Sequence, residues 1–262
     1  MKLIMCDMDG TLLNDEKELP HDFYDVLGKL KAKDVKFGIA SGRQMIFIEP
    51  FFKEEFEDMY IIANNGTTIN KGHKLLYCEK FDKEVIRMVE KETLKHDNLF
   101  VIYMGVEKAY YNYDDEETMD AIRYYIGDLH RYHDIEDVLA NDEIVKVAIY
   151  DVDYDAEHNA KDYDYINEYA SVLVSDIQFF DIVPKGTSKG EALQEIMNEL
   201  GYGPKDVVVF GDYNNDISML EKAYYSYAMG NAVEDVKKVA RFSCDDNNHE
   251  GVTKVLKELY HL

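Results

Sequence analysis

The chain of 262 residues has no tryptophan, only three cysteines and no long apolar run. Cys6, Cys78 and Cys244 are odd in number, widely spaced and lack a C-x-x-C pair, so neither a disulfide framework nor a zinc site is indicated. No stretch approaches the roughly 18 apolar residues of a membrane span, and the first apolar stretch stops at Asp7, too short for a signal sequence. We therefore expect a cytoplasmic protein without a membrane partner.

Basic residues are also scarce, because 29 lysines and arginines stand against 53 aspartates and glutamates, a formal net charge of −24. A surface with this much negative charge repels the phosphate backbone of nucleic acid, so nucleic acid is an unfavourable main partner. The apolar fraction of 46% is sufficient for a buried core. At about 150 residues per domain, the length allows one large domain or two modest ones.

Both ends of the sequence alternate short β-branched apolar runs with longer helix-periodic stretches, which predicts an α/β fold with a parallel sheet. In the first 60 or so residues the alternating segments are Lys2–Cys6, Phe23–Leu30, Val35–Ala40, Gln44–Phe56 and Tyr60–Ala63. Near the C-terminus the helix Lys189–Leu200, the buried strand Val207–Phe210 and the helix Asp216–Lys222 repeat the rhythm. We expect both ends to form one Rossmann-like core of residues 1–80 and 186–262.

The intervening residues, 81–185, are acidic and rich in tyrosine, and they predict an inserted α+β domain. Its expected strands are Leu99–Met104, Ile144–Tyr150 and Ile177–Val183, and its expected helices are Lys83–His96, Glu116–Gly127 and Glu157–Tyr169. The tyrosines have no fixed period, so no internal repeat is indicated.

The string Asp7-Met8-Asp9-Gly10-Thr11 directly follows the first apolar strand. Ligands of open α/β sheets bind beyond the carboxyl ends of the strands. Residues i and i+2 of an extended chain point to the same side, so Asp7 and Asp9 can face one reacting centre, while Gly10 permits a sharp turn. The alternative is a solvated Asp-Gly turn without function.

A second acidic string, Gly211 to Asp216, follows the strand Val207–Phe210. If the two strands are neighbours, Asp7 and Asp212 converge, and a hard cation such as Mg²⁺ would relieve their repulsion. A calcium loop is disfavoured because Ile217 and Ala223 occupy the positions that need glycine and glutamate. An ordinary polar loop, with Asp216 as a helix cap, remains the other interpretation.

The third string is Thr187-Ser188-Lys189-Gly190-Glu191, in which Ser188 and Glu191 form a capping-box pattern. Lys189 then lies in the first helical turn, where its charge opposes the helix dipole. An anion held between the lysine and the helix would offset that cost, and phosphate would suit. A solvated lysine is the alternative.

The fourth string, Ala40-Ser41-Gly42-Arg43, follows the strand Val35–Ile39. A hydroxyl, a glycine amide and the start of a helix can together hold phosphoryl oxygens. On its own the string is equally consistent with a strand-to-helix turn capped by serine.

Taken together, and in their order along the chain, the four strings resemble those of the haloacid dehalogenase superfamily. Within it, they resemble the Cof-type sugar-phosphate phosphatases with a type IIB cap. The resemblance covers the whole chain and implies that 81–185 is the cap. It implies Asp7 as nucleophile and Asp9 as general acid/base. Asn65-Gly66 resembles the family's Asn-Gly loop, although Thr67 stands where alanine is common, and Asp181-Ile182-Val183-Pro184 resembles the return from cap to core.

The resemblance also implies the remaining site residues. The groups implied to hold the phosphoryl oxygens are Met8, Ser41, Gly42, Lys189 and Asn215. The implied Mg²⁺ ligands are Asp7, the backbone carbonyl of Asp9, Asp212 and Asp216. Arg43, Asn65 and Gly66 are the expected substrate contacts, while Lys185 and Thr187 depart from frequent family choices.

The function implied is Mg²⁺-dependent hydrolysis of a small phosphorylated metabolite, such as a sugar phosphate, through an aspartyl phosphate. A phosphomutase that returns the phosphoryl group to a second hydroxyl is one alternative, and a non-catalytic binder of phosphorylated metabolites is another. The cap is expected to select the leaving group through tyrosines such as Tyr110, Tyr111, Tyr124 and Tyr125, unless these only pack its core. A monomer or a weak homodimer is expected.

Overall fold

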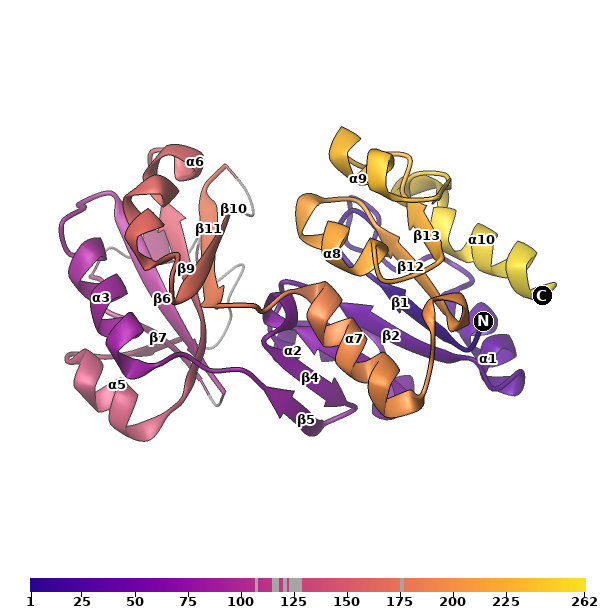
Figure 1. Cartoon of the computed structure of the whole chain (residues 1–262), viewed down its shortest axis with the longest axis horizontal. Coiled ribbons are helices and arrows are strands. Elements are labelled where there is room, and N and C mark those ends of the chain that lie inside the picture. Colours follow the sequence, from indigo (N-terminus) through magenta and orange to yellow (C-terminus); the bar gives the residue numbers. More distant parts are fainter. Residues whose placement is uncertain (107, 115–117, 120–121, 123–128, 175–176) are drawn as a thin grey trace. The chain divides into compact units, whose positions relative to one another are not determined.

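The computed structural model contains two compact units (Figure 1). Met1–Tyr77 and Ser188–Leu262 form the first unit, and the continuous segment Cys78–Thr187 forms the second. The structure describes residues 1–262 except 107, 115–117, 120–121, 123–128 and 175–176. Within the described residues, every helix is too short or too polar to cross a membrane.

An eight-stranded sheet forms the centre of the first unit, in the order β14-β13-β12-β1-β2-β3-β4-β5. From β14 to β3 all neighbours are parallel, and β4 is antiparallel to β3, so the predicted α/β class with a parallel-sheet core is confirmed. The strands are β1 (Leu3–Cys6), β2 (Lys36–Ala40), β3 (Tyr60–Ala63), β4 (Thr68–Lys71), β5 (Lys74–Cys78), β12 (Val207–Gly211), β13 (Tyr225–Ala228) and β14 (Phe242–Ser243). The central strands β1 and β12 are buried along their whole length, which explains their unbroken apolar sequences.

Helices flank this sheet, with α1 packed against α10, and α8 packed against both α7 and α9. They are α1 (Phe23–Ala32), α2 (Met45–Ile48), α7 (Lys189–Leu200), α8 (Ile217–Leu220), α9 (Glu234–Val239) and α10 (Gly251–Tyr260). Short 3₁₀ turns are η1 (Glu49–Phe51), η2 (Lys53–Asp58), η3 (Asn64–Gly66), η5 (Pro204–Asp206), η6 (Asn214–Asp216) and η7 (Asn247–His249). Helix α7 begins where Ser188 Oγ accepts a hydrogen bond from the Glu191 N–H and ends at left-handed Gly201, as its caps predict.

The prediction of one helix over Gln44–Phe56 is wrong. The segment forms one α-helical turn, α2, followed by the 3₁₀ turns η1 and η2. Pro50 has no N–H to donate to the carbonyl of the preceding turn, so it cannot continue an α-helix there. The broken path still buries Ile48, Phe52 and Phe56 in the core.

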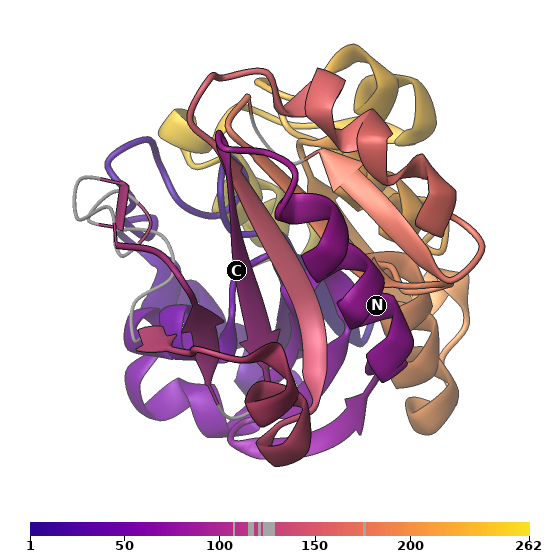
Figure 2. The same ribbon diagram turned by 90° about the vertical axis from the view of Figure 1, so that its left-hand side faces the viewer.

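The second unit is built on a six-stranded sheet in the order β10-β11-β9-β6-β7-β8, antiparallel except for the parallel pair β7 and β8. Its strands are β6 (Leu99–Gly105), β7 (Ala109–Tyr111), β8 (Leu129–Arg131), β9 (Ile144–Asp151), β10 (Ala170–Val174) and β11 (Phe179–Pro184). One face is covered by α3 (Lys83–Thr93), α5 (Ile135–Asn141), α6 (Ala156–Asn159) and the 3₁₀ segment η4 (Ala160–Ile166), which stand in front of the strands in Figure 2.

Two expectations for the second unit need correction, and a third is open. The expected helix Glu157–Tyr169 is a single α-turn followed by η4, because Ala160, Tyr163 and Ile166 are buried at a spacing of three residues, the period of a 3₁₀ helix. The expected strand Ile177–Val183 begins later, at Phe179. Most of the expected helix Glu116–Gly127, with Tyr124 and Tyr125, lies outside the described residues.

Candidate active site

Strands β1 and β12 are parallel neighbours in which Cys6 pairs with Phe210, so the segments that follow them start at the same edge of the sheet. The Asp7 N–H donates to the Phe210 carbonyl at 3.1 Å, which extends the pairing by one residue. This register brings the first acidic string beside the second.

Three carboxylates meet at this edge. Asp7, Asp212 and Asp216 each place an oxygen within 4.8 Å of the others. Lys189 lies among them, with Nζ 2.7 Å from Asp7 Oδ1 and 2.7 Å from Asp216 Oδ1. Its side chain is only 1% exposed, so it is not the solvated lysine of the alternative interpretation. The site thus combines one buried ammonium with three carboxylates.

Neighbouring groups fix the orientation of the second acidic string. Asp216 Oδ2 accepts hydrogen bonds from the N–H groups of Asp212 at 2.9 Å and Tyr213 at 3.1 Å. Thr11 Oγ1 donates to Asp212 Oδ1 at 2.7 Å. Gly10 has a left-handed backbone, and a Cβ atom there would lie 2.4 Å from Asp212 Oδ2, so glycine permits the close approach.

The electrostatics of this cluster show a shortage of positive charge. Burial raises the pKa of Asp7 well above its ordinary value, and the charges of Asp216 and Asp212 add to the effect against the opposing pull of Lys189. Burial, with the charge of Asp216, raises the pKa of Asp212 to about 6. Burial alone would lower the pKa of Lys189, but the two carboxylates that it contacts outweigh burial and raise it.

The side chain of Asp9 has different partners. Arg43 donates from Nε to Oδ2 at 2.6 Å and from Nη2 to Oδ1 at 2.6 Å, and Lys17 Nζ donates to Oδ1 at 2.8 Å. Burial tends to raise the pKa of Asp9, but the hydrogen bonds and charges of Arg43 and Lys17 hold it below its ordinary value. Asp9 is therefore a carboxylate in this arrangement.

The Ser41–Arg43 turn lies beside the same edge. Ser41 is buried, and its N–H donates to the Ile62 carbonyl at 2.8 Å. Its Oγ accepts from the Arg43 N–H at 3.1 Å, which leaves the hydroxyl proton for an acceptor such as a phosphoryl oxygen. Asn215, from the second acidic string, donates from Nδ2 to Asn65 Oδ1 at 3.1 Å.

The surroundings of three further predicted residues, Met8, Arg43 and Asn65, bear on their implied roles. The Met8 side chain is fully buried in the apolar core, so only its backbone is suited to bind phosphate. Arg43 engages Asp9, and Asn65 is 3% exposed. Sequence reasoning assigned no role to Thr11, although it lies in the first string, or to Lys17, for which the sequence carried no signal.

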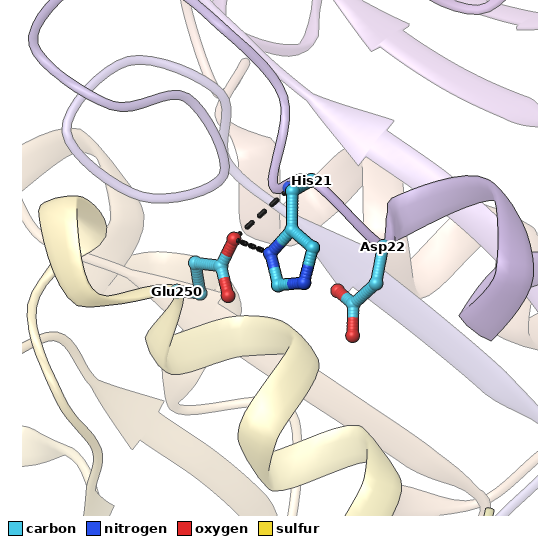
Figure 3. Close-up of side chains that lie close together, drawn as sticks. All are labelled: His21, Asp22 and Glu250. Carbon is cyan, nitrogen blue, oxygen red and sulfur yellow. Dashed lines mark hydrogen bonds and ion pairs between the residues drawn. The ribbon is translucent and has the colours of Figure 1, made fainter.

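A second group with metal-ligand chemistry, His21, Asp22 and Glu250, lies elsewhere in the first unit (Figure 3). Both His21 Nδ1 and the His21 N–H contact Glu250 Oε1, the latter at 2.9 Å. Asp22 is paired with the ammonium of Lys257. The ammonium of Lys257 therefore already neutralises one carboxylate of this group, which links the loop before α1 to the start of α10.

Comparison with known proteins gives one consistent result. The chain is 28% identical to the 5-amino-6-(5-phospho-D-ribitylamino)uracil phosphatase YbjI of Escherichia coli over 270 residues, which cover 99% of this chain and 96% of that one. Among solved structures, TM0651 of Thermotoga maritima superposes with a TM-score of 0.85 at 26% identity, over 98% and 97% of the two chains. SMU.1108c of Streptococcus mutans superposes with a TM-score of 0.91 at 24% identity over both whole chains, which is a likeness of fold.

The sequence profile of the haloacid dehalogenase-like hydrolases matches residues 4–256, nearly the whole chain and all four strings. The resemblance inferred from those strings is thereby confirmed. With relatives that are phosphatases and a cluster of carboxylates around a buried lysine, the chain belongs to the haloacid dehalogenase-like hydrolases and is an enzyme of the phosphatase type.

Proposed function

We propose that the chain hydrolyses small phosphate monoesters, sugar or sugar-alcohol phosphates above all, with Mg²⁺ and through an aspartyl phosphate on Asp7. The observation that carries this proposal is the buried group of Asp7, Asp216 and Lys189, joined by Asp212 at the carboxyl ends of β1 and β12. Asp9 is the proposed general acid and base.

The donor set fits Mg²⁺. Asp7, Asp212 and Asp216 supply only oxygen ligands, which hard divalent cations prefer. Three carboxylates face one ammonium, and burial together with their mutual repulsion raises the pKa values of Asp7 and Asp212, which supports the proposal of a further positive charge. These residues, with the Asp9 backbone carbonyl, would hold the ion. When bound, Mg²⁺ neutralises charge on the carboxylates and on the phosphoryl group.

In the first half of the proposed reaction, an Asp7 carboxylate oxygen attacks phosphorus as the ester P–O bond breaks. The electron pair of that bond passes to the leaving oxygen, which takes a proton from Asp9. The Ser41 hydroxyl, the Gly42 amide, Lys189 and Asn215 hold the phosphoryl oxygens, since catalysis of this transfer depends mainly on positioning and charge.

In the second half, Asp9 takes a proton from water as the water oxygen attacks phosphorus and the bond to Asp7 breaks. Inorganic phosphate leaves, Asp7 is a carboxylate again and Asp9 is protonated. Before substrate binds, Arg43 and Lys17 stabilise the carboxylate form of Asp9. In the first half Asp9 must carry a proton. We therefore expect Arg43 and Lys17 to move away from the Asp9 carboxyl group when substrate binds.

The preference for a phosphorylated sugar alcohol draws support from the Escherichia coli relative, whose named substrate carries its phosphate on a ribityl chain. We propose that the second unit, whose predicted extent is 81–185, selects the leaving group. The Tyr110 hydroxyl donates a hydrogen bond to Asp142 Oδ2 at 3.0 Å, so a group of the second unit itself already engages this tyrosine.

The proposal is tested by phosphate release over a panel of sugar phosphates, sugar-alcohol phosphates, nucleotides and cofactor phosphates with Mg²⁺. We expect hydrolysis of several small esters, its loss after exhaustive chelation, and poor replacement of Mg²⁺ by the larger Ca²⁺. Full activity after chelation would overturn the metal assignment. Formation of a phosphate isomer without phosphate release would assign a phosphomutase instead.

A further inference from the structure

The loop Asn64–Gly66 contacts two of the strings that the proposed function uses. The Asn65 N–H donates to the Ser41 carbonyl at 3.0 Å, and the Asn64 N–H donates to the Arg43 carbonyl at 2.9 Å. Gly66 packs so closely on the start of α7 that a Cβ atom there would lie 2.3 Å from the Ser188 carbonyl oxygen. The loop is therefore fixed against both the Ser41–Arg43 turn and the helix that carries Lys189.

The carboxamide of Asn65 adds the third contact. Its Oδ1 accepts from Asn215 Nδ2 at 3.1 Å, and a Cβ atom at Gly42 would lie 3.1 Å from the same oxygen. The side chain is 3% exposed. Its backbone is left-handed, with φ 58°, a conformation that asparagine tolerates better than most residues.

We infer that Asn65 is a positioning residue that holds Asn215 and the Ser41–Gly42 turn in the arrangement needed to bind the phosphoryl group. The inference rests on the proposed role of those groups as phosphate ligands, and it replaces the expectation that Asn65 contacts substrate directly. Because Asn65 Oδ1 engages one N–H of the Asn215 amide, it fixes the direction of the other. A donor already aimed at its acceptor loses less freedom when phosphate binds.

The neighbouring residue provides a matched control. Asn64 is also an asparagine with a left-handed backbone, φ 51°, and it is also buried, at 5% exposure. Its Oδ1, however, has no hydrogen-bond partner within the described part of the chain. Substitution by glycine suits both backbones, and Asn65→Gly removes the contact with Asn215 that Asn64→Gly leaves in place.

The test measures the binding of inorganic phosphate to the Mg²⁺-loaded full chain by calorimetry, together with kcat and KM for one hydrolysed ester. Asn65→Gly should weaken phosphate binding about 5- to 20-fold, the usual size of one or two lost hydrogen bonds, and raise KM in parallel. Asn64→Gly should stay within about 2-fold of the parent. The thermal midpoint of each variant checks folding, and an alanine pair, equally strained at both positions, repeats the comparison.

A double-mutant cycle separates positioning from a general structural effect. In an Asn215→Ala background, Asn65→Gly should weaken phosphate binding by less than about 2-fold, because its partner is already gone. Equal effects of the Asn64 and Asn65 substitutions, or an undiminished Asn65 effect in that background, would overturn the inference while the proposed function stands. A parent chain that neither binds phosphate nor hydrolyses any ester would overturn both.

Discussion

The two units of the chain differ in what their buried polar groups do. Both groups of three clustered metal-ligand-type side chains among the described residues lie in the first unit. More than half of the chain's 21 tyrosines lie in the second unit, and two of them, Tyr103 and Tyr132, form internal hydrogen bonds with Glu90.

This difference indicates a division of labour. In the first unit, the segments after two strands bring three carboxylates together, and the start of helix α7 adds one lysine, so three carboxylates face one ammonium. In the second unit, the buried hydroxyls of Thr93 and Tyr163 are hydrogen-bonded to each other, which is the pattern of a stable scaffold. We propose that the first unit carries out the charge chemistry and that the second unit contributes the surface that recognises the leaving group. The following experiments are designed to break or sharpen this comparison.

The largest effect is expected from Asp7→Asn, which removes the nucleophilic oxygen anion and keeps the shape of the side chain. Turnover of any phosphate ester should fall at least ~10²-fold in a phosphate-release assay, with the thermal midpoint showing an intact fold. The same substitution at Asp34, a fully exposed residue of the first unit, is the control and should leave turnover unchanged. A parental rate for Asp7→Asn would remove Asp7 from the mechanism.

Lys189→Met should be the most destabilising of these substitutions. Without the ammonium, Asp7 and Asp216 stay buried near Asp212 without their cation, and the free energy of unfolding should fall by about 3–5 kcal/mol in urea titrations with chelator present. Lys238→Met, at an exposed ion pair, should change it very little. Unchanged stability of the Lys189 variant would mean that the cluster is not charged as we describe.

Replacing the second unit by a short linker tests the division directly. The two units have separate apolar cores, so the first should keep its fold. The ranking of sugar phosphates should change by more than ~10-fold in relative kcat/KM, while cleavage of a small activated ester changes less. A folded first unit that kept the parent's ranking would place selectivity in core loops such as Asn64–Thr67.

Two threonine substitutions compare the units at the level of one hydrogen bond. Thr11→Val removes the donor to Asp212 Oδ1 and should raise the Mg²⁺ concentration for half-maximal activity roughly 5-fold, at a cost of about 1 kcal/mol in stability. Thr93→Val removes the contact with Tyr163 and should cost a similar amount without changing the Mg²⁺ dependence. If activity depended on Mg²⁺ concentration in the same way in both variants, Thr11 would not orient Asp212 for the metal.

The smallest effect concerns His21. Hydrogen bonding and charge from Glu250 raise the pKa of His21 above its ordinary value, so the folded state binds the proton more tightly than the unfolded state. This contribution is full below the unfolded pKa and is lost as pH rises through the raised folded pKa. The thermal midpoint of the parent should exceed that of His21→Gln by more at about pH 6 than at about pH 9. The opposite trend would exclude the ion pair.

Sequence patterns predicted the centre of the first unit well because β1, β2 and β12 are buried on both faces, and this requirement leaves unbroken apolar runs. Patterns predicted continuous helices poorly where apolar spacing was ambiguous. The segments around Pro50 and Tyr163 keep a buried face, but they form 3₁₀ turns that a helical periodicity search does not distinguish from α-helix.

For the candidate site, the sequence predicted that Asp7 and Asp212 converge, because parallel strands end at a shared edge. Lys189 lies at the start of a helix, and only the resemblance implied its place in the site. The partners of Asp9 were not predictable, since Lys17 reaches it from a loop whose path depends on packing against the C-terminal part of the chain, as at Asp15 and Asn248. The contact of Asn65 with Asn215 joins positions 150 residues apart, so no local sequence pattern predicts it.

The central claim, that Asp7 carries the phosphoryl group, is tested most directly in the Asp9→Asn variant with an activated aryl phosphate. Such a leaving group needs no proton, so the first half proceeds, while the second half stalls for lack of a base. Borohydride reduction of the quenched protein and mass spectrometry of its peptides should then find homoserine at position 7, dependent on substrate and Mg²⁺. Release of the aryl alcohol with an unmodified Asp7, or modification of another residue, would contradict the account.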